Sequence, residues 1–142
     1  MSTIRNVTIL IAFAASAAPA LAEEEDAAEL AFNGHCRNCH SMKEGDNRLG
    51  PSMFRIMGKK AGQVAGFNYS PALKNSTIVW TDDVMDKWIE NPGAVAAGNS
   101  MSPPYNGIAD AEIRKHIITF MKSGGKAGDA PAEKPAPETK AE

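Results

Sequence analysis

The stretch Cys36-Arg37-Asn38-Cys39-His40 decides the fold of this 142-residue chain, and it holds the only two cysteines in the sequence. Residues three and four positions apart share a face of a helix. Both thiols would then lie along one edge of a porphyrin, where each can add to a vinyl group, and His40 would lie under the iron as an axial ligand. Cys-x-x-Cys-His is the attachment signature of a c-type haem. The sequence therefore predicts one haem c, attached covalently through Cys36 and Cys39.

Other interpretations of the two cysteines are weaker. A thioredoxin-like redox pair needs a preceding strand and a βαβ unit, and the sequence around the motif has neither pattern. A structural zinc site needs four ligands, and the chain offers no further cysteine, while His35 and His116 complete the set poorly. A chance pentapeptide or a simple disulfide remains, but the downstream sequence agrees better with haem attachment.

Residues 1–22 have the features of a secretory signal peptide. Arg5 supplies a positive start, an apolar run follows at 7–15, and Ala20-Leu21-Ala22 forms a small-x-small cleavage site. An uncleaved membrane anchor is the alternative, but the apolar run is short for a span of about 20 residues. The sequence predicts cleavage after Ala22, a periplasmic mature protein and no stable membrane insertion after cleavage.

Residues 124–142 form a tail of Ala, Pro, Glu and Lys that opens with Gly124-Gly125. Such a composition has almost nothing to bury, so we expect the tail to be disordered. The folded domain is then 23–123, a small domain with few large apolar residues. A buried haem would add the apolar surface that this core lacks.

Charge argues against a nucleic-acid partner, because the formal net charge is −2 at pH 7. Acidic residues gather at 23–26, whereas basic residues gather between Arg37 and Lys60. This distribution indicates either a charge dipole or ordinary solvated surface.

The pattern predicts an all-α fold with three main helices and long loops. The expected helices run from Glu23 to about Asn38, from Asp82 to about Asn91, and from the capping residue Asp110 to about Ser123. Thr81 can cap the second helix and Pro92 ends it. Apolar residues at helical spacing mark the buried faces: Ala28 and Phe32; Val84, Met85, Trp88 and Ile89; Ile113, Ile117, Phe120 and Met121.

The second axial ligand of the iron is open between Met101, His116, another methionine and no protein ligand at all. Met101 stands in the long loop 91–107 with no apolar periodicity around it. Met85 and Met121 lie on apolar helix faces, which favours packing, and His116 lies beside apolar residues of the last helix as a half-buried histidine would. The loop has no arginine or lysine around Met101, so we expect few contacts to fix it apart from an iron–sulfur bond.

Several further motifs accompany the haem signature in a fixed order. Together they resemble class I cytochrome c, the family of small monohaem electron carriers, and the resemblance covers about 28–122. The matching stretches are Cys36-Arg37-Asn38-Cys39-His40, Leu49-Gly50-Pro51, Ala61-Gly62-Gln63, Gly66-Phe67-Asn68-Tyr69-Ser70, Trp80, Glu90-Asn91-Pro92 and Gly98-Asn99-Ser100-Met101.

The resemblance implies a cytochrome c fold and a role for each matching residue. Cys36 and Cys39 would bind haem, His40 would be the proximal ligand and Met101 the distal one. The remaining implied haem contacts are the Pro51 carbonyl, which would accept a hydrogen bond from His40, and Tyr69 and Trp80, which would bond a haem propionate.

The resemblance also implies that the first helix crosses the last, with Ala28 and Phe32 near Ile117 and Phe120. One departure concerns the haem edge, because Pro103 stands where an aromatic residue often covers it.

These observations predict a periplasmic electron-transfer protein, not an enzyme, that carries one electron on a His/Met-ligated haem. It would be a monomer that docks transiently with membrane electron-transfer complexes or periplasmic dehydrogenases. A haem enzyme or gas-binding sensor with a labile distal methionine is the alternative from another class. A dedicated subunit of a dehydrogenase complex is a third interpretation.

Overall fold

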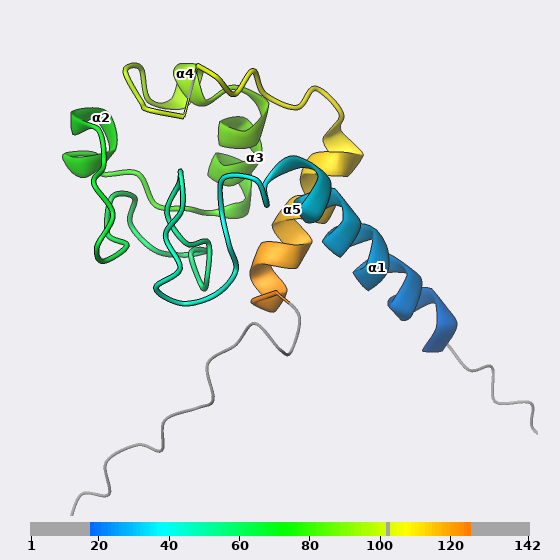
Figure 1. The fold of residues 1–142 in the computed structure, drawn as a ribbon. Helices are drawn as coiled ribbons and strands as arrows, with labels where there is room; N and C mark the ends of the chain where they lie inside the picture. Colours follow the sequence, from blue (N-terminus) through cyan, green and yellow to red (C-terminus); the bar gives the residue numbers. More distant parts are fainter. Residues whose placement is uncertain (1–17, 102, 126–142) are drawn as a thin grey trace, which may run out of the picture.

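The computed structural model describes residues 18–101 and 103–125, with side chains from residue 23 onward. Most of the expected signal segment 1–22 and nearly all of the expected tail 124–142 lie outside the described residues. The described elements are helices α1 (Ala18–His35), α2 (Pro71–Lys74), α3 (Asp82–Glu90), α4 (Pro92–Val95) and α5 (Ala111–Ser123) (Figure 1). Their only sheet-like pairing is an isolated antiparallel bridge between Lys60 and Val79, so the all-α prediction is confirmed.

Helix α1 begins earlier than expected and ends earlier too. The sequence predicted 23–38, whereas α1 spans Ala18–His35. Alanine and leucine at 18–22 have high helix propensity, which extends the helix toward the N-terminus. As a result, the acidic residues 23–26 lie beyond the first turn of α1, not within it.

The two other main helices begin at the predicted caps. The Thr81 hydroxyl oxygen accepts a hydrogen bond from the Val84 amide at 3.3 Å and opens α3. The Asp110 carboxylate accepts from two amides of the first turn of α5, at 2.9 and 3.2 Å. Gly124 follows the last turn of α5 in the left-handed conformation, with φ of 79°, so the predicted stop is confirmed.

Two one-turn helices were not predicted. Pro71 opens α2 and Pro92 opens α4, because proline has the fixed φ of a first helical position and lacks an amide hydrogen that would go unpaired there. The Asn91 side chain caps α4 by accepting from the Ala94 amide at 3.2 Å. Pro92 therefore ends α3 as expected but also starts a new turn, so the loop expected at 91–107 is partly helical.

The core forms where α1 crosses α5, the two helices that lie against each other in Figure 1. The rings of Phe32 and Phe120 meet with centroids 5.1 Å apart. Ala28 and Ile117 are buried in the same cluster. The predicted crossing of the first and last helices is confirmed, and it fixes the end of α1 from which Cys36 follows.

A buried arginine ties α5 to α3. The Arg114 guanidinium donates to the Asp86 carboxylate at 2.7 and 3.3 Å. It also donates to the backbone carbonyls of Ile108 and Ala109, at 3.0 and 2.8 Å. These bonds satisfy the buried charge and fix α3 and the chain that leads into α5.

Candidate haem-binding site

The attachment motif continues the helical turn of α1. The Cys36 amide donates to the Phe32 carbonyl at 2.8 Å, and the amides of Cys39 and His40 donate to the Cys36 carbonyl at 3.1 and 2.9 Å. Both cysteines are half-buried free thiols, so the simple disulfide interpretation is not what the structure shows. Burial, and then the neighbouring Cys39, raises the pKa of the Cys36 thiol to about 12.

His40 is oriented by a hydrogen bond to the following loop. Its Nδ1 atom lies 2.8 Å from the carbonyl oxygen of Pro51, the contact that the family resemblance implies. A carbonyl can only accept, so Nδ1 carries the hydrogen and Nε2 keeps its lone pair for a metal. Burial lowers the pKa of His40, and the bond to Pro51 acts in the opposite direction; a neutral imidazole is the form that ligates iron.

Gly50 lies directly against the His40 ring. A Cβ atom built on Gly50 would overlap ring atom Cε1 and would lie 2.6 Å from Nδ1 and 2.7 Å from Nε2. Real carbon atoms do not approach so closely, so this position accommodates only glycine. Gly50 belongs to one of the motifs noted in the sequence, but the sequence does not reveal its contact with the His40 ring.

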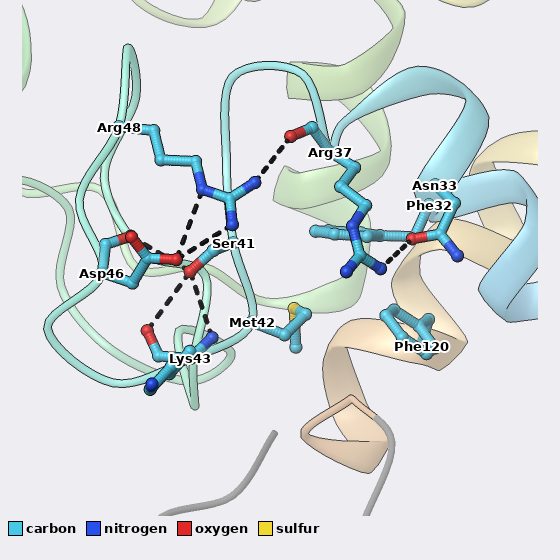
Figure 2. A pocket seen from close by; sticks show the side chains of 9 residues that line it. All are labelled: Phe32, Asn33, Arg37, Ser41, Met42, Lys43, Asp46, Arg48 and Phe120. Atoms are coloured by element: carbon cyan, nitrogen blue, oxygen red, sulfur yellow. Dashed lines mark hydrogen bonds and ion pairs between the residues drawn. The ribbon is translucent and has the colours of Figure 1, made fainter. Parts of the chain in front are cut away.

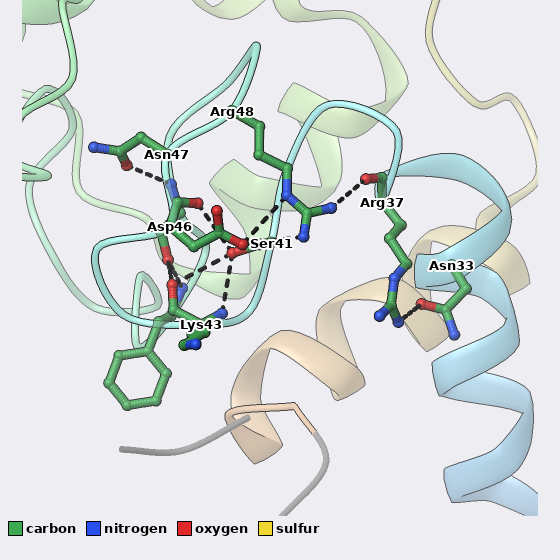
Figure 3. A network of polar contacts seen from close by, with 9 residues as sticks. Asn33, Arg37, Ser41, Lys43, Asp46, Asn47 and Arg48 are labelled. Atoms are coloured by element: carbon green, nitrogen blue, oxygen red, sulfur yellow. Dashed lines mark hydrogen bonds and ion pairs between the residues drawn. The ribbon is translucent and has the colours of Figure 1, made fainter. Parts of the chain in front are cut away.

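Loop 41–53, which delivers Gly50 and Pro51, is tied back to the attachment turn. The Arg48 guanidinium donates to the Arg37 carbonyl at 3.1 Å and to the Asp46 carboxylate at 3.3 and 3.0 Å; these contacts are drawn as dashed lines in Figure 3. The Arg48 hydrogen bond lowers the pKa of the Asp46 carboxyl. The Gly50 amide donates to the Cys39 carbonyl at 2.8 Å, so two independent bonds hold the loop to the motif.

Asn47 joins the same loop to the next one. Its side-chain oxygen accepts from the Ser52 amide at 2.9 Å, and its side-chain nitrogen donates to the Ala65 carbonyl at 2.9 Å. The loop around Ala65 leads to Tyr69, so Asn47 connects the His40 side of the site to the segment expected to hold a haem propionate.

A small pocket beside this network is not the haem site. Figure 2 shows it between the end of α1, loop 41–48 and α5. Its volume is about 80 Å³, well below the roughly 300 Å³ of a typical cofactor pocket. Neither cysteine lines it; the lining residues are Phe32, Asn33, Arg37, Ser41, Met42, Lys43, Asp46, Arg48 and Phe120.

Aromatic residues gather where a propionate contact is expected. Tyr69 is half-buried and packs edge-on against Phe67, with ring centroids 4.9 Å apart. Burial raises the pKa of Tyr69. Trp80 is buried and packs edge-on against Trp88 at 5.2 Å. The neighbouring Ser70 hydroxyl is buried and has no hydrogen-bond partner among the described residues, so it can serve a polar ligand group; the sequence did not single it out.

Burial separates Met85 and Met121 from the other two candidates for the distal ligand, Met101 and His116. Met85 and Met121 are 1% and 3% exposed within the core, as expected for packing. Met101 is half-buried at the edge of the core, and so its sulfur has room to meet a ligand. His116 is half-buried on α5, and its Nδ1 atom has no partner among the described residues.

Tyr105 follows Met101 by four positions and packs half-buried against the core. The pKa of its hydroxyl is raised first by burial and then by Cys36. Tyr105 thus supplies an aromatic ring in this part of the chain, whereas the resemblance located the missing aromatic at Pro103.

The donor set fits a covalently attached haem. Two free thiols stand on one turn, a neutral imidazole is oriented through Nδ1, and the Met101 thioether is half-buried at the edge of the core. Imidazole with thioether is a known axial pair for haem iron. Among the described residues 18–101 and 103–125, no group of three or more His, Cys, Asp or Glu side chains could hold a metal ion, so that part of the chain contains no ligand set for zinc.

Comparison with known proteins identifies the family of this chain. No protein-family model matches the chain. Cytochrome c from Arabidopsis thaliana is 34% identical over 96 residues, which are 67% of this chain and 84% of the relative. Cytochrome c2 from Blastochloris viridis is 36% identical over 114 residues, or 80% of this chain and 87% of the relative. The chain belongs to the class I cytochrome c family.

The structural comparison gives the same family. The structure of cytochrome cH from Methylobacterium extorquens superposes with a TM-score of 0.63 at 31% identity, covering 70% of this chain and 97% of that one. Members of the family are electron carriers and not enzymes, so this cytochrome c is an electron carrier. Family membership implies haem c, and Cys36 and Cys39 fit the attachment motif. Among the described helices, none has both the length and the apolar character needed to cross a membrane.

Proposed function

We propose that this cytochrome c is a periplasmic carrier that moves one electron at a time on a single haem held by His40 and Met101. The observation that carries the proposal is the proximal arrangement: Nδ1 of His40 lies 2.8 Å from the Pro51 carbonyl. That bond presents Nε2 as an iron ligand and increases its basicity. Gly50, pressed against the ring, prevents the imidazole from turning away.

The other residues have distinct tasks in this proposal. Cys36 and Cys39 would hold the haem edge through two thioether bonds, and Tyr69 and Trp80 would donate hydrogen bonds to a propionate. The buried Ser70 hydroxyl, which has no partner within the described part of the chain, supports a polar group at that end. When bound, the haem supplies the one-electron chemistry, and the chain contributes fixed ligands and a low-dielectric surrounding that excludes water.

Met101 gives the site its redox character. A thioether is a soft ligand that favours ferrous iron, and its pairing with histidine raises the potential. Since His40 and Met101 would both ligate the iron, no position would be left there for a substrate, which favours a carrier over a haem enzyme or gas sensor. Partners would be membrane electron-transfer complexes or periplasmic dehydrogenases that dock transiently on a monomer.

The periplasmic assignment rests on the sequence of 1–22. Cleavage after Ala22 would leave the folded domain 23–123 and the tail 124–142. Helix α1 would then begin near Glu23, and the acidic residues at 23–26 would enter its first turn, where the helix dipole favours negative charge.

The test is expression with the export segment in a host with periplasmic haem-ligation machinery. We expect the exported protein to stain for covalent haem, and a visible spectrum with a redox titration to report one His/Met-ligated centre. The double variant Cys36→Ala, Cys39→Ala should lose the covalent stain. Full staining of that variant, or covalent haem on protein retained in the cytoplasm, would contradict the proposal.

A further inference from the structure

The loop that carries Met101 is anchored on both sides of this residue, contrary to the sequence-based expectation of few contacts. On the N-terminal side, the Asn99 side chain is buried. Its nitrogen donates to the Ala96 carbonyl and its oxygen accepts from the Met101 amide, both at 2.9 Å. The backbone of Met101 is thereby bonded to the turn that follows α4.

On the C-terminal side, Tyr105 forms the second anchor. Its amide donates to the Met101 carbonyl at 3.0 Å. Its hydroxyl donates to the Ile89 carbonyl at 2.6 Å. One residue therefore links the Met101 backbone to the last turn of α3, and this link does not involve iron.

The carbonyl that receives the Tyr105 hydroxyl is itself fixed. The Ile108 amide donates to the same Ile89 oxygen at 3.0 Å. Gly107, with φ of 89°, passes so close to α3 that a Cβ atom there would overlap the Glu90 carbonyl oxygen. Since Arg114 holds α3 to α5 through Asp86, the Tyr105 bond ends on a rigid part of the core.

We propose that Tyr105 and Asn99 are positioning residues for the distal ligand, and that they keep Met101 in its ligating place independently of the iron–sulfur bond. The inference rests on the proposed function, because it takes Met101 as the ligand. It adds how access to the iron is controlled: because the Met101 backbone is already bonded to Asn99 and Tyr105, the sulfur returns readily and external ligands compete poorly.

The size of the effect follows from the bonds that hold the loop. Losing one hydrogen bond that holds the Met101 backbone ready for ligation lowers the population of that conformation, and so raises the fraction of open sites by up to about tenfold. Carbon monoxide, which binds ferrous iron only when the sulfur is away, measures that fraction directly.

The experiment uses the haem-loaded protein. Tyr105→Phe removes only the hydroxyl, and Tyr105→Leu also removes the ring. Carbon monoxide affinity of the ferrous protein should rise by up to about tenfold in Tyr105→Phe and further in Tyr105→Leu. The long-wavelength absorption band of the ferric iron–methionine bond should weaken in the same order.

Thr81→Ala is the matched control, because it removes a cap from the other end of α3 and so destabilises the same helix. It should lower the unfolding temperature without changing carbon monoxide affinity. Equal affinities in wild type and both Tyr105 variants, or an equal gain in Thr81→Ala, would overturn the inference. A wild-type protein without the iron–methionine band would instead overturn the ligand assignment under the proposed function.

Discussion

The two sides of the haem site are held by different means. On the proximal side the ligand side chain itself is fixed, since His40 is bonded through Nδ1 to Pro51 and confined by Gly50. On the distal side the backbone of Met101 is fixed, through Asn99 and Tyr105. Substitutions on the proximal side should therefore reduce the yield of haem-loaded protein. Substitutions on the distal side should instead change the redox potential and the affinity for external ligands.

Gly50→Ala is the substitution that should disrupt the proximal side of the site most strongly. The added methyl group would overlap the His40 ring, so the loop or the imidazole must move. We expect severe loss of haem-loaded protein and a destabilisation of about 3 kcal/mol or more in what remains, measured by haem stain and denaturant unfolding. Gly34→Ala is the control, because a methyl group there meets nothing within 4 Å. Since Gly34 lies in helix α1, this substitution should raise the free energy of unfolding by about 0.5–1 kcal/mol. Equal yields from the two variants would refute the confinement of His40.

Met85→Ala tests whether the distal ligand is Met101 and not a methionine of the core. Met85 is 1% exposed, so its truncation should cost about 2–5 kcal/mol of unfolding free energy. The redox potential should stay nearly unchanged, because the side chain packs without ligating. Chemical denaturation and a redox titration of the same sample check both statements. A large shift in redox potential in Met85→Ala would contradict the assignment of Met101, and not Met85, as the iron ligand.

Asn47→Ala tests whether the proximal network extends to the propionate end. It removes one hydrogen bond inside loop 41–53, to the Ser52 amide, and one that joins this loop to the loop at Ala65, so we expect a loss of about 1–3 kcal/mol. Amide hydrogen exchange should rise in 61–70 more than in the Met101 loop. The exposed residue Asn106 offers the control Asn106→Ala; the same exchange pattern in both variants would mean that Asn47 does not couple the loops.

Asp46 gives the smallest expected effect, and it depends on pH. Its pKa is lowered by the Arg48 hydrogen bond, so the pair stabilises the fold above the ordinary aspartate pKa of about 3.9. The contribution is lost as the pH falls through the lower pKa of the folded state. Unfolding midpoints of wild type and Asp46→Asn should therefore differ at neutral pH and converge in acid. A difference that persists in acid would contradict this account.

The sequence predicted the features that depend on neighbouring residues. The caps Thr81 and Asp110 and the stop at Gly124 bond within their own helix turns, so local pattern was enough. The crossing of α1 and α5 came from the family resemblance and from apolar spacing. The attachment motif could be recognised in the sequence because its two cysteines and its histidine lie within a single turn.

The features that were missed depend on partners far along the chain. Arg114 is buried because Asp86 neutralises it from another helix, and an isolated helix pattern cannot reveal that. Tyr105 anchors the distal loop through a carbonyl of α3. Because every residue has a backbone carbonyl, the sequence cannot show which one accepts this bond. The prediction of a loosely held loop was wrong for this reason: it counted charged side chains and ignored bonds to the backbone.

The most direct test of the His40/Met101 account is the ferric spectrum and redox potential of Met101→Ala beside those of His116→Ala. We predict that Met101→Ala loses the iron–methionine band, binds carbon monoxide when reduced, and drops in potential by on the order of 0.1 V. His116→Ala should keep the wild-type spectrum and potential. If Met101→Ala keeps both while His116→Ala destroys them, the haem is held by two histidines and the account is wrong.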